Sequence, residues 1–223
     1  MKIKGAIFDM DGTVIDSLSF WDVLWKSIGE KYMNDASFKP SDEVNRQVRT
    51  MIYTEAMAYF KECYALPGRT EDFVEFASQG LVDFYKTTAT AKAGVKALLS
   101  YLKARGVPLC LASATAPDWV KYALECHDLL QYFDFVISCA DIGAGKEKPD
   151  IYIKAKKLLG LSQEEICVVE DSFVALETAK KAGFQTVGVY DRYSPGQERL
   201  QSAADIYLQP EQTLEDLIDC IKF

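Results

Sequence analysis

The most informative stretch of this chain is Ile3-Lys4-Gly5-Ala6-Ile7-Phe8-Asp9-Met10-Asp11-Gly12-Thr13. Its first half is an apolar run that predicts a buried strand. Asp9 and Asp11 follow at the carboxyl end of that strand, where the alternation of side chains points both carboxylates the same way. Gly12 then allows the chain to turn sharply. Such a pair of like charges is usually stabilised by a cation, and two carboxylates with a hard divalent metal suit phosphoryl transfer.

Composition places the chain among soluble globular proteins. It has 223 residues, of which 49% are hydrophobic and 26% charged, which suits one large domain or one and a half. The net charge of −8 argues against a nucleic-acid partner. The sequence contains no apolar run long enough to span a membrane, and its start lacks the pattern of a signal peptide. We therefore expect no membrane partner.

The cysteines indicate a reducing environment. All six are scattered, and none forms a Cys-x-x-Cys pair. Cys110 and Cys167 sit in apolar, strand-like runs, which predicts buried thiols rather than a disulfide framework or a zinc site. We expect a cytoplasmic protein and, by default, a monomer.

Residues 17–88 form a helical region without an expected strand. Apolar residues recur there at helical spacing. Breaks fall at Pro40-Ser41-Asp42, where Ser41 or Asp42 could cap a helix, and at Leu66-Pro67-Gly68. We expect a separate helical domain over residues 17–88, inserted after the first strand.

Beyond residue 88 the pattern changes to strands and helices in strict alternation. This order predicts an α/β fold with a parallel sheet and helices on both faces, built from residues 1–16 and 89–223. The expected strands are 109–112, 135–138, 166–169, 186–189 and, weakly, 205–208. The expected helices are 95–105, 117–125, 150–159, 173–182 and 214–221.

Polar side chains follow four of these strands. The carboxyl ends of parallel strands meet at one edge of a sheet, where ligands bind. An acid pair, a hydroxyl, a lysine and a second acid pair at that edge supply a nucleophile, a metal site and a cation for a phosphoryl group. In chain order they are Asp9 and Asp11, Ser113-Ala114-Thr115, the loop containing Lys146 and Lys148, and Glu170-Asp171-Ser172.

This arrangement resembles the haloacid dehalogenase superfamily, and specifically its phosphoglucomutase- and phosphatase-like members. The resemblance covers nearly the whole chain. Its most specific part is Asp9-x-Asp11-Gly12-Thr13, followed by Glu170-Asp171-Ser172 with Ala175, Ala179, Ala182 and Gly183 behind it. It implies a Rossmann-like three-layer core with an inserted α-helical cap domain.

The resemblance also implies roles for the residues. Asp9 would attack phosphorus and form an aspartyl-phosphate, while Asp11 would protonate the leaving oxygen and later deprotonate the attacking water. The Ser113 hydroxyl and the Ala114 amide would bind the phosphoryl oxygens. A lysine would offset the charge of the nucleophile and of the transferring group.

The cofactor implied by the resemblance is Mg²⁺. Its ligands would be the carboxylate of Asp9, the main-chain carbonyl of Asp11 and Asp171. Glu170 would support the metal directly or through its other ligands. Glu170 and Asp171 could also simply cap the following helix, since acids favour helix N-termini.

Two lysines compete for one role. Related chains often read Lys-Pro-x-Pro-Asp-x-Tyr, and Pro149-Asp150-Ile151-Tyr152 matches the end of that pattern. Alignment on the helix start makes Lys146 the functional residue and is favoured. Alignment on Lys148-Pro149 would select Lys148 and shorten the segment.

Hydrolysis of a small phosphorylated metabolite is the leading functional hypothesis. A phosphosugar mutase is the alternative, although residues 16–21 lack the histidine that mutases of this group carry, and His127 is the only histidine. A receiver-like or catalytically silent phospho-ligand-binding protein is the non-enzyme alternative. Trp21 and Trp25 are interpreted as core of the helical domain rather than as substrate contacts, although an aromatic residue on its first helix can face the cleft. Arg46 and Arg49 are interpreted as surface residues, although an arginine of this domain could bind a distal phosphate or carboxylate.

Overall fold

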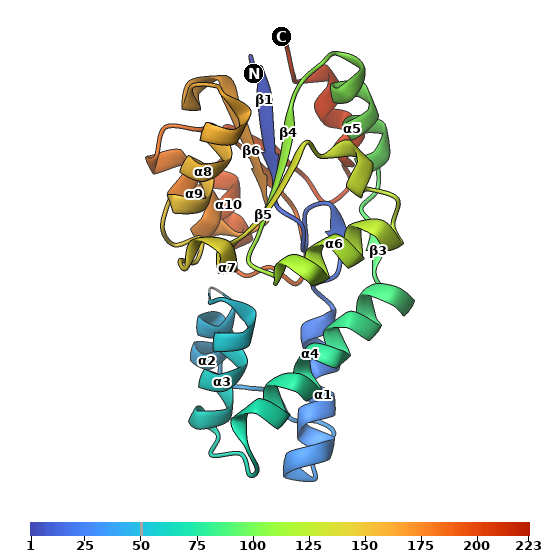
Figure 1. The fold of residues 1–223 in the computed structure, drawn as a ribbon, viewed down its shortest axis with the longest axis vertical. Coiled ribbons are helices and arrows are strands. Elements are labelled where there is room, and N and C mark those ends of the chain that lie inside the picture. Colours follow the sequence, from blue (N-terminus) through green and yellow to red (C-terminus); the bar gives the residue numbers. More distant parts are fainter. Residues whose placement is uncertain (50) are drawn as a thin grey trace.

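The computed structural model describes residues 1–49 and 51–223, and its centre is a six-stranded sheet. All five neighbouring strand pairs are parallel, and the strand order is β5-β4-β1-β6-β7-β8 (Figure 1). The predicted α/β fold is therefore confirmed. The strands are β1 (Gly5–Phe8), β4 (Leu109–Ser113), β5 (Phe135–Ser138), β6 (Ile166–Glu170), β7 (Gln185–Val189) and β8 (Ile206–Leu208).

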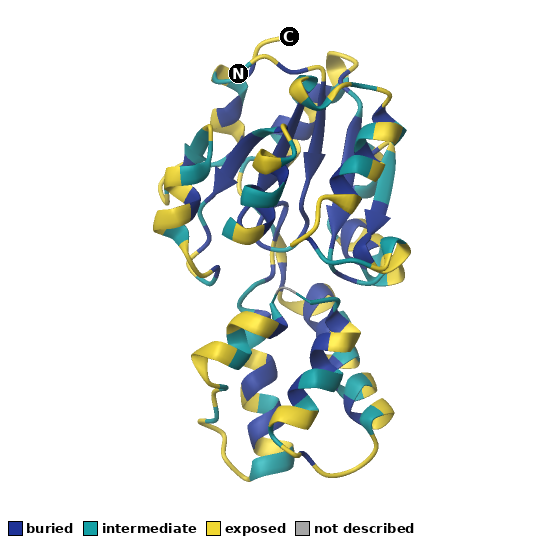
Figure 2. Ribbon diagram, turned by 90° about the vertical axis from the view of Figure 1, so that its left-hand side faces the viewer, coloured by how far each residue is buried: buried dark blue, intermediate teal, exposed yellow. Residues whose placement is uncertain are grey.

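Helices cover both faces of this sheet. Every residue of β1, β4 and β6 is buried, as expected for strands packed on two sides (Figure 2). Because side chains alternate along a strand, Phe8 belongs to one apolar cluster and Ile7 to the other. The helices over the sheet include α5 (Val95–Ala104), α6 (Pro117–Cys126), α8 (Asp150–Leu159) and α9 (Phe173–Lys181).

A bundle of helices lies beyond the carboxyl edge of the sheet (Figure 1). Aromatic rings form its core: Trp25 stacks on Phe60 at 4.8 Å, and Phe60 on Phe73 at 6.2 Å between ring centroids. Such rings bury large apolar areas and so hold the helices together. The bundle consists of α1 (Phe20–Ile28), the π-helical turn η1 (Gly29–Met33), α2 (Asp42–Val48), α3 (Tyr53–Cys63) and α4 (Thr70–Thr87).

A short antiparallel ribbon joins the bundle to the sheet. Its strands are β2 (Ile15–Asp16) and β3 (Thr90–Ala91), which pair through Ile15 with Ala91 and Asp16 with Thr90. Sequence analysis did not predict this ribbon, because two-residue strands carry no periodicity and form only when the two connecting segments lie together.

Other short elements also differ from expectation. The helices α7 (Cys139–Ile142) and α10 (Gln197–Ala203) were not predicted, and the last predicted helix is the 3₁₀ helix η4 (Leu214–Asp219). Such short elements depend more on their neighbours than on their own propensity. Two local predictions are confirmed: Ser41 caps α2 by accepting from the amide of Val44 at 3.3 Å, and the free thiols of Cys110 and Cys167 are buried.

Each helix of residues 1–49 and 51–223 falls short of the length or the apolar character that a bilayer span requires.

Candidate active site

The turn after β1 is packed directly against the end of β6. Gly12 has a φ of +84°, and a β-carbon there would lie 2.7 Å from Cγ of Asp171. The hydroxyl of Thr13 donates to Oδ1 of Asp171 at 3.2 Å. The Gly12-Thr13 dipeptide is therefore needed both for the turn and for the close approach of two acidic loops.

Three buried carboxylates meet at this point. One oxygen from each of Asp9, Glu170 and Asp171 lies within 4.8 Å of the others. Burial, followed by the charge of Glu170, raises the pKa of Asp9 to about 7. Burial and the charges of Asp9 and Glu170 also raise the pKa of Asp171 well above its usual value. Clustered carboxylates that resist ionisation this strongly fit a hard divalent cation such as Mg²⁺.

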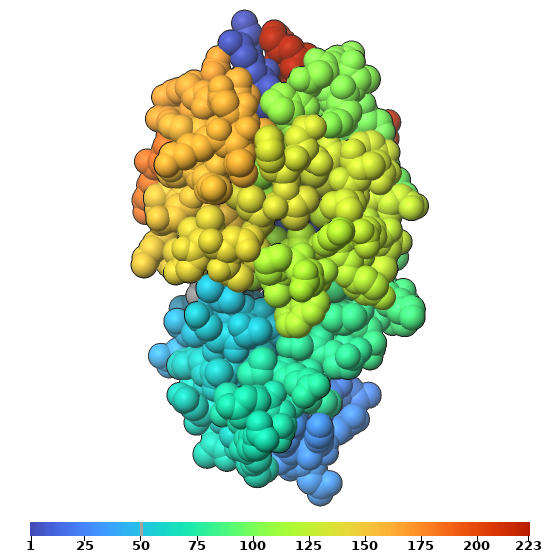
Figure 3. Space-filling model, in the orientation of Figure 1, coloured from blue at the N-terminus to red at the C-terminus, as the bar shows by residue number. Residues whose placement is uncertain are grey.

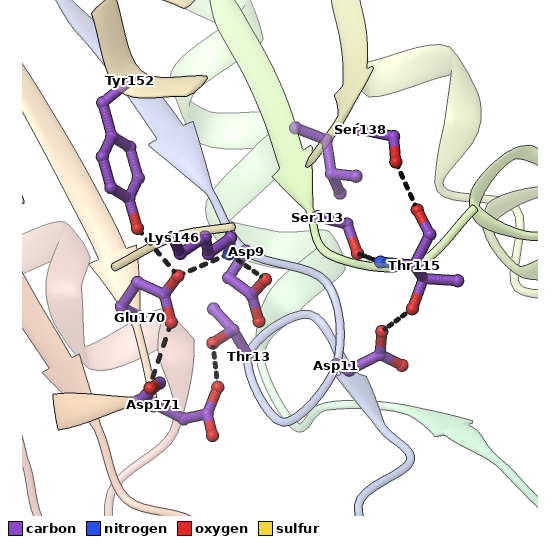
Figure 4. A network of polar contacts seen from close by, with 12 residues as sticks. Asp9, Asp11, Thr13, Ser113, Thr115, Ser138, Lys146, Tyr152, Glu170 and Asp171 are labelled. Atoms are coloured by element: carbon purple, nitrogen blue, oxygen red, sulfur yellow. Dashed lines mark hydrogen bonds and ion pairs between the residues drawn. The ribbon is translucent and has the colours of Figure 1, made fainter. Parts of the chain in front are cut away.

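Lys146 provides the positive charge next to this cluster. Its Nζ donates to Oδ1 of Asp9 and to Oε1 of Glu170 (Figure 4). Burial lowers the pKa of Lys146, but the charges of Asp9 and Glu170 outweigh it and raise the pKa well above its usual value. The hydroxyl of Tyr152 donates to the same Glu170 oxygen at 3.2 Å. Lys148 is exposed and lies outside this network, so of the two lysines it is Lys146 that contacts Asp9.

Asp11 points away from the lysine. In Figure 4 the Asp9 carboxylate lies beside Lys146, whereas the Asp11 carboxylate lies toward Thr115. Thr115 donates to Oδ2 of Asp11 at 2.9 Å, and Ser17 and Tyr85 donate to Oδ1 at 2.7 and 2.6 Å. Burial and the charge of Asp9 raise the pKa of Asp11, which suits a carboxyl that must carry a proton.

The end of β4 forms the opposite wall. Ser113 is buried, and its Oγ accepts from the amide of Thr115 at 3.0 Å. The hydroxyl of Ser138 donates to the Thr115 carbonyl at 2.6 Å and so fixes the same turn. Ser113 and Ala114 line one cavity together with Asp9 and the other predicted site residues.

That cavity has a volume of about 440 Å³ and lies between the sheet edge and the helical bundle. Figure 3 shows the bundle abutting that edge. This volume is in the usual range for a small-molecule site. Trp21 and Arg49 line it from the bundle, and the guanidinium of Arg49 lies 5.0 Å from the ring centre of Trp21.

The interpretation of Arg49 as a surface residue is wrong. It is partly buried and donates from Nη1 to the carbonyl of Tyr193 at 3.1 Å and from Nε to Oδ1 of Asn45 at 3.1 Å. Burial lowers the pKa of Arg49 to about 10, so it stays charged at neutral pH. Within residues 1–49 and 51–223, it forms no ion pair with a carboxylate. Arg46 is exposed, as expected, although it too lines the cavity.

The two tryptophans also differ from each other. Trp25 is core of the bundle, at 3% exposure, as expected. Trp21 is only partly buried and forms part of the cavity wall.

Sequence reasoning missed the contacts of three further residues. Thr115 stood in the predicted strand-end triplet, and Tyr152 stood in the pattern used to align the lysine, but neither was given a partner. Tyr85 carries no local signal, because its contact with Asp11 joins residues 74 positions apart. Only folding brings the end of α4 to the first strand.

Comparison with known proteins agrees with this geometry. A profile of the haloacid dehalogenase-like hydrolases matches residues 3–183, and the chain belongs to this family. It is therefore an enzyme of a hydrolase family, as the sequence predicted, with the sheet and helices that the resemblance implied.

The alignments with relatives and with solved structures cover almost the whole chain. The "Phosphorylated carbohydrates phosphatase" of Thermotoga maritima is 25% identical over 217 residues, covering 96% of this chain and 98% of the relative. The "Probable pseudouridine-5'-phosphatase" of Drosophila melanogaster is 30% identical over 224 residues, covering 95% and 94%. The crystal structure of CbbY from Rhodobacter sphaeroides in complex with phosphate superposes with a TM-score of 0.80 at 21% identity, covering 96% of each chain.

Proposed function

We propose that this chain is a Mg²⁺-dependent phosphatase that hydrolyses a small phosphorylated metabolite, a sugar phosphate or similar phosphomonoester, through an aspartyl-phosphate. The observation that carries the proposal is the contact of Lys146 with Asp9 and Glu170 inside the carboxylate cluster. Phosphoryl transfer requires a nucleophile, a positive charge beside it and a metal site, and the edge of this sheet offers a candidate for each.

In the first step, the Asp9 carboxylate forms a bond to phosphorus while the bond to the leaving oxygen breaks. Asp11 gives its proton to that oxygen. Lys146 offsets the negative charge, and the Ser113 hydroxyl and the Ala114 amide hold the phosphoryl oxygens. The alcohol product then leaves.

In the second step, water attacks phosphorus and displaces the Asp9 carboxylate, and Asp11 takes the proton from the water. Over one cycle, Asp11 therefore regains from water the proton that it gave to the leaving oxygen. The carboxylates of Asp9 and Asp171 and the main-chain carbonyl of Asp11 would hold Mg²⁺, with Glu170 in support. When bound, the metal supplies positive charge against the phosphoryl group.

We further propose that residues 17–88 form a cap domain that excludes water and selects the leaving group. The activities named for the Thermotoga maritima and Drosophila melanogaster relatives support a phosphorylated carbohydrate or nucleoside as substrate class. We also propose that the protein acts as a cytoplasmic monomer, an expectation that size-exclusion chromatography and localisation can test.

The test is phosphate release from 4-nitrophenyl phosphate with Mg²⁺ and with a chelator, followed by a panel of sugar phosphates and nucleoside monophosphates. Activity that needs Mg²⁺ and is lost in Asp9→Asn supports the proposal. Equal activity in both proteins would remove Asp9 as nucleophile, and an inactive wild type would favour the silent binding protein.

The mutase alternative differs in its product. A mutase must return the phosphoryl group to a sugar, so a hexose 1-phosphate with a bisphosphate primer should give an isomer rather than free phosphate. The single histidine, His127, caps α6 and is not among the residues that line the cavity. This observation favours hydrolysis.

A further inference from the structure

Asp11 is held by hydroxyl groups from three separate parts of the fold. Ser17 follows the ribbon strand β2, Tyr85 lies near the end of α4, and Thr115 follows β4. They donate to Asp11 at 2.7, 2.6 and 2.9 Å, respectively. Three donors from separate elements fix the orientation of this carboxylate group far more tightly than solvent would.

The three donors are divided unequally between the two carboxylate oxygens. Ser17 and Tyr85 both donate to Oδ1 of Asp11, and Thr115 donates to Oδ2. A carboxylate oxygen has two lone pairs, so two donors saturate Oδ1. Oδ2 keeps one lone pair and is the oxygen that can carry and transfer a proton.

Tyr85 is built as a fixed donor. Its side chain is 1% exposed, and its helix α4 packs against both α1 and α6. Its hydroxyl donates to Oδ1 of Asp11 at 2.6 Å, and the carboxylate oxygen can only accept. The Tyr85 side chain has only two rotatable bonds and is closely packed, so its hydroxyl has little freedom to move.

We propose that Tyr85 is a positioning residue, which holds Oδ1 of Asp11 so that Oδ2 meets the leaving oxygen of the substrate. The inference rests on the proposed function, in which Asp11 is the acid and base. In this proposal helix α4 of the bundle helps to orient the carboxylate of Asp11, although Asp11 itself belongs to the loop after β1.

The test exploits the dependence of acid catalysis on the leaving group. Phenyl phosphate releases a weakly acidic phenol and needs protonation, whereas 4-nitrophenyl phosphate releases a much more acidic phenol and needs little. Tyr85→Phe keeps the ring and removes only the hydroxyl. Because a positioned acid contributes about 10²–10⁴-fold, loss of one of two anchors should lower kcat/KM for phenyl phosphate by about 10-fold. The value for 4-nitrophenyl phosphate should fall by less than about 3-fold.

Two further variants complete the design. Ser17→Ala removes the second donor to Oδ1 and should give the same selective loss. Tyr64→Phe is the matched control, since the Tyr64 hydroxyl lies in the bundle and accepts from the amide of Ser41 at 2.8 Å, away from Asp11. Its ratio of the two kcat/KM values should equal that of wild type.

Equal losses on both substrates, or no loss on either, would overturn the role of Tyr85, and a lowered melting temperature with an unchanged ratio would show a structural role only. Failure of the proposed function looks different, because wild type would then release no phosphate from 4-nitrophenyl phosphate in the presence of Mg²⁺.

Discussion

The ammonium group of Lys146 donates a hydrogen bond to the carboxylate of Asp9, 137 residues away in the sequence. This contact joins the loop before α8 to the end of β1. Lys148 of the same loop is exposed and does not take part in this contact.

Loss of either the Asp9 carboxylate or the Lys146 ammonium group should abolish most of the phosphatase activity. We expect Asp9→Asn to lower kcat on 4-nitrophenyl phosphate by at least about 10³-fold, because an amide is a poor nucleophile. Lys146→Ala should cost about 10²–10³-fold, which is typical when one charge-stabilising donor is removed from an active site. Steady-state kinetics measure both. Lys148→Ala is the control and should keep wild-type kcat; an inactive Lys148→Ala with an active Lys146→Ala would reverse the assignment.

The carboxylate cluster should make stability depend on pH and on metal. The pKa of Asp9 is about 7 in the folded protein and near 3.8 when unfolded. Between these values the folded state binds the extra proton, so the free energy of unfolding falls as pH rises. Mg²⁺ held by the ionised carboxylates, as proposed, should restore the stability that is lost at high pH. The melting temperature in chelator should therefore be lower at about pH 8 than at about pH 5.5, and Mg²⁺ should raise it more at the higher pH.

Asp9→Asn should weaken this dependence, because the amide does not titrate, while the raised pKa values of Asp11 and Asp171 keep part of it. A melting temperature in chelator that rises steadily from about pH 5.5 to about pH 8 would contradict the shifted pKa.

Arg49 should govern substrate affinity rather than the chemical step. Its charged guanidinium lines the cavity and forms no ion pair with a carboxylate among the described residues. We expect Arg49→Ala to raise KM for the best anionic substrate of the panel by about 10-fold with kcat nearly unchanged, the result of losing one charge-assisted contact. Arg105→Ala removes an exposed charge outside the cavity and should leave KM unaltered. A fall in kcat alone would instead place Arg49 in the reaction.

Gly12→Ala should destabilise the protein through both strain and collision. Its φ of +84° disfavours a side chain, and a β-carbon would lie 2.7 Å from Cγ of Asp171. We expect a loss of at least about 2 kcal/mol in the free energy of unfolding, measured by denaturant titration. Gly68 has the same φ of +84° but nothing within 4 Å of its β-carbon position, so Gly68→Ala isolates the backbone cost and should lose less. Equal losses would show that the contact with Asp171 is unimportant.

Much of the core could be predicted from local patterns. Buried parallel strands are continuous apolar runs, and their polar ends predict that Asp9, Ser113 and Asp171 lie at one edge of the sheet. The short ribbon β2–β3 and the helix α7 could not be predicted in this way, because elements of two to four residues are stabilised by the segments that surround them.

The class of fold and the chemical groups of the candidate site follow from the sequence, since strand periodicity and motif order are local properties of the chain. The folded structure is needed to show that Lys146 rather than Lys148 contacts Asp9, that Arg49 lines the cavity and that Tyr85 reaches Asp11. These outcomes depend on how the helical bundle and the loops pack against the sheet edge. The contact of Tyr85 with Asp11 joins residues 74 positions apart, and that of Lys146 with Asp9 joins residues 137 positions apart, so no periodic sequence pattern predicts them. They form when folding buries these polar groups, because buried polar groups need hydrogen-bond partners.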